Sequence, residues 1–140
     1  MSSRLSMVLL AILAGMCACD GAGKRYATLA DAQASGIIAR GWLPDVLPSS
    51  AHNIRVSTDL DLNTSAGEFS FAPAEFDALL PRLQPYVKAK HPFTAGFDVK
   101  IAGHMAAGYP ALQYKEEDSI WVFLCRPKSG HCDYTMWLER

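Results

Sequence analysis

The chain has 140 residues, enough for one ordinary domain, and half of them are hydrophobic. Its 13 basic and 14 acidic residues leave a formal net charge of −1. This balance argues against a nucleic-acid-binding protein, because such proteins present a basic patch or stripe to the phosphates.

The first residues have the pattern of a secretory signal. Arg4 precedes an apolar run over residues 5–16, which is shorter than the roughly 20 residues that a membrane-spanning helix needs. Two cysteines follow it, as in bacterial lipoprotein signals. We expect residues 1–18 to be removed and Cys19 to receive an acyl anchor such as palmitate. Cys17 is the alternative acceptor, and secretion without lipid is the alternative to both.

Lipidation would place the protein in the cell envelope, facing the periplasm. With Cys19 as the first mature residue, Asp20 stands second, which resembles a signal for retention in the inner membrane. With Cys17 first, Ala18 stands second, and delivery to the outer membrane is expected. The sequence leaves both membranes open.

A short tether is predicted over residues 19–25, followed by a single domain over residues 26–140. The domain is expected to begin with a helix over residues 28–36. Thr28 can cap this helix, and Gly36 is a natural stop.

Residues 37–54 are strongly apolar, but Pro44 and Pro48 exclude regular structure there. Trp42 is the candidate partner-binding residue, because Trp is common at binding hot spots. The simpler alternative is that its ring packs into the core, as large aromatic rings usually do.

Alternation of apolar and polar residues over 54–62 predicts a half-buried strand. A turn over residues 63–67 would lead into a returning strand, which gives a hairpin over residues 54–71. The D-x-D-x-N pattern resembles the start of a calcium loop, but the Gly and Glu that such a loop needs further on are missing. Its residues are Asp59, Asp61 and Asn63.

A second helix is predicted over residues 73–83, where Pro73 suits the first position and leucines recur at helical spacing until Pro81 interrupts them. Residues 84–110 are rich in Pro and Gly. We expect a short strand over residues 97–101 and a loop over residues 103–110.

The C-terminal residues 111–138 are predicted to form a three-stranded meander with an apolar central strand. Cys125 and Cys132 are expected to form a disulfide across its second turn. That bond would pair residues whose numbers sum to 257, such as Phe123 with Tyr134. Zinc binding by Cys125, His131 and Cys132 is the alternative, but it lacks a fourth ligand.

The four histidines show no metal-binding spacing, and the chain has no G-x-S-x-G motif or phosphate-binding loop. They are His52, His91, His104 and His131. We therefore predict no catalytic residue, metal or other cofactor, although a site assembled by the fold remains open.

The stretch from Tyr26 to Phe71 resembles a recurrent pattern in uncharacterised bacterial lipoproteins. Its pieces are A-x-x-x-G, RGWLPDVLP at residues 40–48, SAHNI at residues 50–54, DLDLN at residues 59–63 and FSF. The resemblance implies an envelope lipoprotein and carries no functional residue with it.

These patterns together predict an α+β domain with an antiparallel sheet of about five strands and two short helices. The function expected first is a non-enzymatic module, anchored to the bilayer, that binds an envelope protein or the cell wall. The alternatives are a small periplasmic hydrolase or metal-dependent enzyme, and an immunity-type inhibitor of a periplasmic toxin.

Overall fold

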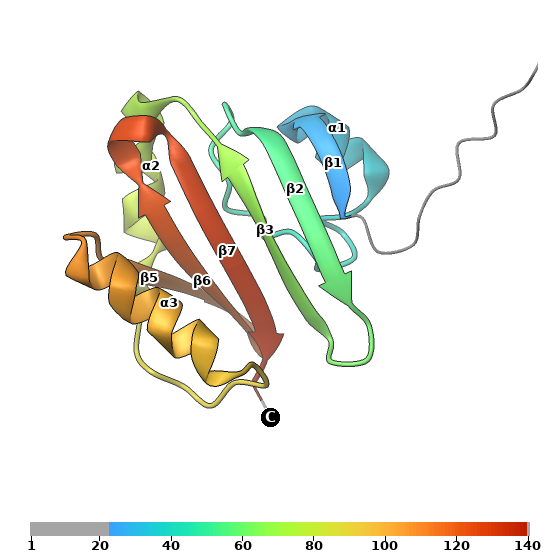
Figure 1. Cartoon of the computed structure of the whole chain (residues 1–140). Helices are drawn as coiled ribbons and strands as arrows, with labels where there is room; N and C mark the ends of the chain where they lie inside the picture. Colours follow the sequence, from blue (N-terminus) through green and yellow to red (C-terminus); the bar gives the residue numbers. More distant parts are fainter. Residues whose placement is uncertain (1–22, 140) are drawn as a thin grey trace, which may run out of the picture.

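The computed structural model describes residues 23–139 as one antiparallel sheet with helices on both faces (Figure 1). Its seven strands follow the order β1-β2-β3-β7-β6-β5-β4. They are β1 (Lys24–Thr28), β2 (His52–Asp59), β3 (Thr64–Ser70), β4 (Gln84–Pro85), β5 (Ala111–Glu116), β6 (Ser119–Arg126) and β7 (His131–Leu138). The helices are α1 (Leu29–Ser35), α2 (Phe76–Leu79) and α3 (Ala95–Ala106).

The α+β class is confirmed, but the sheet has more strands than the five expected. The two additional strands, β1 and β4, lie at its edges. β1 begins at Lys24, inside the predicted tether, and only its Tyr26 is partly buried, so it lacks the alternation that marks a half-buried strand. β4 is two residues long and contains Pro85, which suits an edge.

One face of the sheet, which we call the packed face, carries the larger core. It is covered by α1, the Pro-containing segment 37–51 and the helical turns around α2. Its strand residues alternate with those of the opposite face. Strand residues buried on this face include Ile54, Val56, Phe69, Trp121, Phe123, Cys132, Tyr134 and Met136.

The opposite face, which we call the α3 face, is only partly covered. In Figure 1, α3 lies in front of β5 and β6, while β2 and β3 are open on that side. The small core beneath α3 contains Ile101, Ala111, Ile120, Val122, Leu124 and Trp137. On the open part, cross-strand neighbours form a row of charged side chains, which consists of Arg25, Arg55, Glu68 and Asp133.

The strand predicted over residues 97–101 is wrong, because this segment forms part of α3. The loop predicted over residues 103–110 is wrong for residues 103–106, which also belong to α3, and holds for residues 107–110. Phe97, Ile101 and His104 recur at i, i+4 and i+7 along one side of α3. Phe97 packs against the small core, and Ile101 and His104 are buried. Gly96 and Gly103 obscure this periodicity, since glycine disfavours a helix interior.

The hairpin is confirmed, but its turn lies over residues 60–63, earlier than predicted. Asp59 Oδ1 accepts hydrogen bonds from the backbone amides of Asp61 and Leu62, at 3.0 Å each. This local turn chemistry overrides the alternation of the sequence, so Leu60 and Leu62 are 70% and 51% exposed instead of buried.

The predicted C-terminal meander and its register are confirmed. Phe123 pairs with Tyr134, Cys125 pairs with Cys132, and β6 is buried on both faces. The structure has a disulfide between these two cysteines. The first helix also follows its prediction: the Thr28 hydroxyl accepts from the Asp31 amide, and Gly36 ends the helix with a φ of 79°.

The predicted signal peptide and both candidate lipid acceptors, Cys17 and Cys19, lie outside the described residues. Within residues 23–139, no helix is long and apolar enough to cross a membrane.

Candidate functional site

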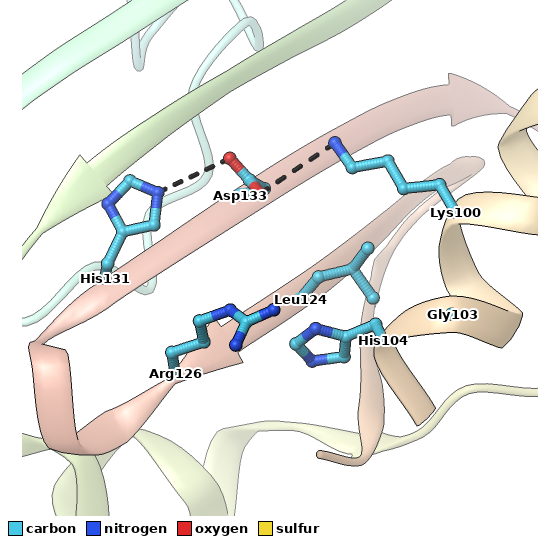
Figure 2. Close-up of a pocket in the computed structure, with 7 residues that line it drawn as sticks. All are labelled: Lys100, Gly103, His104, Leu124, Arg126, His131 and Asp133. Atoms are coloured by element: carbon cyan, nitrogen blue, oxygen red, sulfur yellow. Dashed lines mark ion pairs between the residues drawn. The ribbon is translucent and has the colours of Figure 1, made fainter. Parts of the chain in front are cut away.

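A pocket of about 150 Å³ lies where α3 stops covering the sheet (Figure 2). We call it the α3 pocket. Its polar side chains come from one helix and two neighbouring strands, so residues distant in the sequence meet there. The lining residues are Lys100, Gly103 and His104 of α3, Leu124 and Arg126 of β6, and His131 and Asp133 of β7.

Arg126 is the least neutralised charge in the α3 pocket. Its guanidinium lies 4.9 Å from the ring centre of Tyr109, a cation–π contact, and no carboxylate of residues 23–139 lies within ion-pair distance of it. Lys100 is also weakly paired, with its Nζ 3.9 Å from Asp133 Oδ2. The pocket thus offers two cations against one carboxylate.

His104 adds a neutral polar group to the pocket. Its ring is stacked on Tyr109, and its buried Nε2 has no hydrogen-bond partner among the described residues. Two effects lower the pKa of His104: burial has the larger effect, and the positive charge of Arg126 adds to it. The imidazole is therefore neutral at pH 7, and a bound group can satisfy its Nε2.

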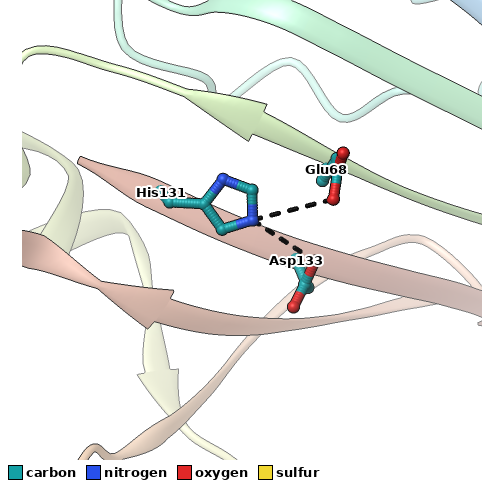
Figure 3. A group of neighbouring side chains, drawn as sticks. All are labelled: Glu68, His131 and Asp133. Atoms are coloured by element: carbon teal, nitrogen blue, oxygen red, sulfur yellow. Dashed lines mark ion pairs between the residues drawn. The ribbon is translucent and has the colours of Figure 1, made fainter. Parts of the chain in front are cut away.

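A second polar group adjoins the pocket on the open part of the α3 face (Figure 3). We call Glu68, His131 and Asp133 the β3–β7 cluster. His131 and Asp133 are two residues apart on β7 and share a face, and Glu68 of β3 lies directly opposite Asp133. His131 Nε2 is 3.8 Å from Glu68 Oε2 and 3.5 Å from Asp133 Oδ1.

Trp42, the candidate partner-binding residue, lies elsewhere, on the packed face. Its ring is half-buried against the larger core. Its carbonyl accepts a hydrogen bond from the Ser65 hydroxyl at 2.7 Å and a longer one from the Tyr134 hydroxyl. These contacts tie the Trp42 segment to the sheet and support the packing alternative.

The other two histidines do not reach the α3 pocket. His52 is exposed, and its Nδ1 donates to the Ser50 carbonyl at 2.8 Å. His91 lies within an aromatic group around Trp137, and its Nε2 is 3.2 Å from Asp98 Oδ1. A shallow cavity of about 310 Å³ borders His91, but it brings no second histidine to it.

The structure does not support the zinc site or the calcium loop that the sequence analysis considered. The zinc set of Cys125, His131 and Cys132 is wrong, because both cysteines are bonded to each other on the packed face and His131 lies on the opposite face. The calcium-like residues lie at the end of β2 and in the hairpin turn, where backbone amides already occupy Asp59 Oδ1.

In a comparison with known families, the model described as the YbbD head domain matches residues 20–70. This stretch holds β1, α1, the Pro-containing segment, β2 and β3, and it suggests a bacterial envelope-related family. No curated protein and no solved structure matches the chain. Of the residues in the α3 pocket and the β3–β7 cluster, only Glu68 lies within the matched stretch. The match therefore assigns no role to the α3 pocket.

Sequence reasoning missed Glu68, Lys100, Arg126 and Asp133. The H-x-D spacing of His131 and Asp133 on a predicted strand already placed them on one face. Nothing in the sequence indicated that β3 pairs with β7, or that α3 brings His104 and Lys100 to the same edge.

Proposed function

We propose that this protein is a lipid-anchored binding module of the bacterial envelope, and that the α3 pocket holds an anionic group of its partner. Three features support the location: the signal-like N-terminus, the GWLPD-x-LP pattern of residues 41–48, and the match of residues 20–70 to the YbbD head domain. The observation that carries the binding role is the convergence of Lys100, Arg126 and neutral His104 on one pocket.

The chemistry of the α3 pocket favours a carboxylate or phosphate group. Arg126 presents a planar fork of donors that matches either group, and its stacking on Tyr109 orders the guanidinium before binding. Lys100 can add a second cation. The free Nε2 of His104 accepts a hydrogen bond from a hydroxyl or amide of the same partner. The small volume suits one such group rather than a whole cofactor.

The test is capture of envelope components by the full chain, purified in detergent from bacterial membranes. We expect Arg126→Gln and Lys100→Gln each to abolish enrichment of a partner that the unaltered chain retains. Lys128→Gln is the matched control, because it removes an exposed cation two residues from Arg126 without touching the pocket. Capture that is insensitive to both pocket variants would contradict the proposal.

Chemical-shift mapping with inorganic phosphate and with acetate gives a direct second readout. We expect either anion to shift the amide signals around residues 100–104 and 124–126 in the unaltered chain, and not in Arg126→Gln. Shifts spread evenly over surface lysines would instead indicate nonspecific binding and overturn the assignment of the pocket.

The second candidate, a small periplasmic hydrolase or metal-dependent enzyme, is favoured by one observation. Two histidines, His104 and His131, line the same pocket beside a carboxylate. A His104→Asn variant separates the two functions: an enzyme would lose turnover of model ester and phosphoester substrates, while a binding module shows no turnover in either form.

A further inference from the structure

We propose that the β3–β7 cluster, Glu68, His131 and Asp133, is a binding site for a divalent transition-metal ion, with Zn²⁺ as the best match. This proposal does not depend on anion binding in the α3 pocket. One imidazole nitrogen and two carboxylate oxygens are ligands that zinc accepts, and three protein ligands leave one position for water or a partner group.

The spacing of the three ligand atoms fits a shared ion better than direct hydrogen bonds. His131 Nε2 lies 3.8 Å from Glu68 Oε2 and 3.5 Å from Asp133 Oδ1, beyond the usual hydrogen-bond range of about 2.7–3.2 Å. Zinc ligands bind at about 2.0–2.2 Å, which separates neighbouring corners of a tetrahedron by about 3.3–3.6 Å. All three ligand atoms lie within 4.8 Å of one another, so small side-chain adjustments bring them around one ion.

The surrounding cations orient the cluster without occupying its centre. Arg55 is paired with Glu68 Oε1, and Lys100 lies 3.9 Å from Asp133 Oδ2. Each carboxylate therefore has its outer oxygen next to a cation, while its inner oxygen faces His131 Nε2. Such outer contacts fix the geometry of metal ligands in many sites.

The pairing of β3 with β7 also positions the three side chains of the cluster. All three side chains project from paired strands in the same direction, with Glu68 opposite Asp133 and Ser70 opposite His131. Their side chains are about one third exposed, so the centre of the cluster is open to an ion from solvent but flanked by protein. The α3 pocket shares His131 and Asp133 with the cluster, so an ion bound by the cluster would lie next to that pocket.

The experiment is calorimetric titration of the full chain, purified in detergent and stripped with a chelator, with ZnCl₂. We expect one Zn²⁺ per chain. The nearly isosteric variants Glu68→Gln and Asp133→Asn, as well as His131→Ala, should each weaken binding by at least about tenfold. Co²⁺ in place of Zn²⁺ should give the visible absorption bands of a four-coordinate ion, and these bands should disappear in His131→Ala.

Matched controls separate this site from other surface groups. Glu116→Gln and His52→Ala remove an exposed carboxylate and an exposed imidazole outside the cluster, and Zn²⁺ affinity should stay unchanged in both. Absence of saturable Zn²⁺ binding, equal affinity in His131→Ala, or equally tight binding of Ca²⁺ would each overturn the proposal. Arg126→Gln should leave the affinity for Zn²⁺ unchanged while it abolishes anion binding in the α3 pocket. The two proposals can therefore fail independently of each other.

Discussion

The two faces of the sheet differ in how completely they are covered. Among the described residues, the core of the packed face contains 18 buried residues, some of them contributed by α1, segment 37–51 and α2. The core of the α3 face contains six, and only α3 and segment 86–93 pack on it. Both polar groups described above lie on the α3 face, at or beyond the edge of that smaller core. The packed face therefore supplies most of the hydrophobic stabilisation, and the incomplete cover of the other face leaves polar side chains accessible.

This division follows from the alternation of side chains along each strand. In β7, the side chains of Cys132, Tyr134 and Met136 lie in the larger core, while those of His131 and Asp133 lie on the α3 face. One strand can thus stabilise the fold and present polar side chains at the same time.

The largest expected effect comes from a cavity in the packed face. Phe123 is fully buried there, and we expect Phe123→Ala to lower the free energy of unfolding by about 3–5 kcal/mol. Denaturant unfolding measures this loss. The matched substitution Val99→Ala, at a 69% exposed position, should change stability by less than about 0.5 kcal/mol. Equal losses would mean that the larger core does not dominate stability.

Removal of the disulfide should have the next largest effect. The bond joins β6 and β7 around an eight-residue loop, and the chain-entropy model predicts a loss of about 2–3 kcal/mol. Thermal unfolding of the double variant Cys125→Ala/Cys132→Ala, compared with that of the oxidised chain, measures this loss. An unchanged melting temperature would show that packing alone holds the two strands together.

Ile101→Ala tests the α3 face by itself. Ile101 fixes α3 to the small core, and its truncation should cost about 2 kcal/mol. Hydrogen exchange should show a loss of protection in α3 that exceeds any loss in β2 and β3, because these strands belong to the other core. Val99→Ala on the same helix is the control. Uniform loss throughout the sheet would mean that the two faces unfold as one unit.

The smallest expected effect concerns the exposed hydrogen bonds that Glu75 accepts from Ser49 and Ser50 at the margin of the packed face. Hydrogen bonds from the Ser50 hydroxyl and amide, and then from the Ser49 hydroxyl, lower the pKa of Glu75 from its usual value of 4.5. Its stabilising contribution is therefore present above pH 4.5 and is lost as the pH falls through the lowered pKa.

The variant Glu75→Gln checks this sign. The stability difference between the unaltered chain and the variant should be measurable at pH 7 and should shrink as the solution is acidified below pH 4.5. A difference that grows in acid would contradict the hydrogen-bond explanation.

Several features were accessible from the sequence because their causes are local. Thr28 and Gly36 delimit α1 by capping chemistry. The pairing of Cys125 with Cys132, together with strict alternation, fixes the register of β6 against β7, since a slip of one residue would reverse every side chain. Segments 97–101 and 60–63 were misjudged because glycines masked the period of α3 and an Asp59 side chain imposed an early turn.

The candidate site, in contrast, was decided by the tertiary structure. The sequence by itself determined that His131 and Asp133 share a face of β7. Only the pairing of β3 with β7 brings Glu68 beside them, and only the packing of α3 on β6 brings Lys100 and His104 to Arg126. Strand order and helix placement depend on contacts between residues distant in the chain, and no local pattern of hydrophobicity or turn chemistry encodes them.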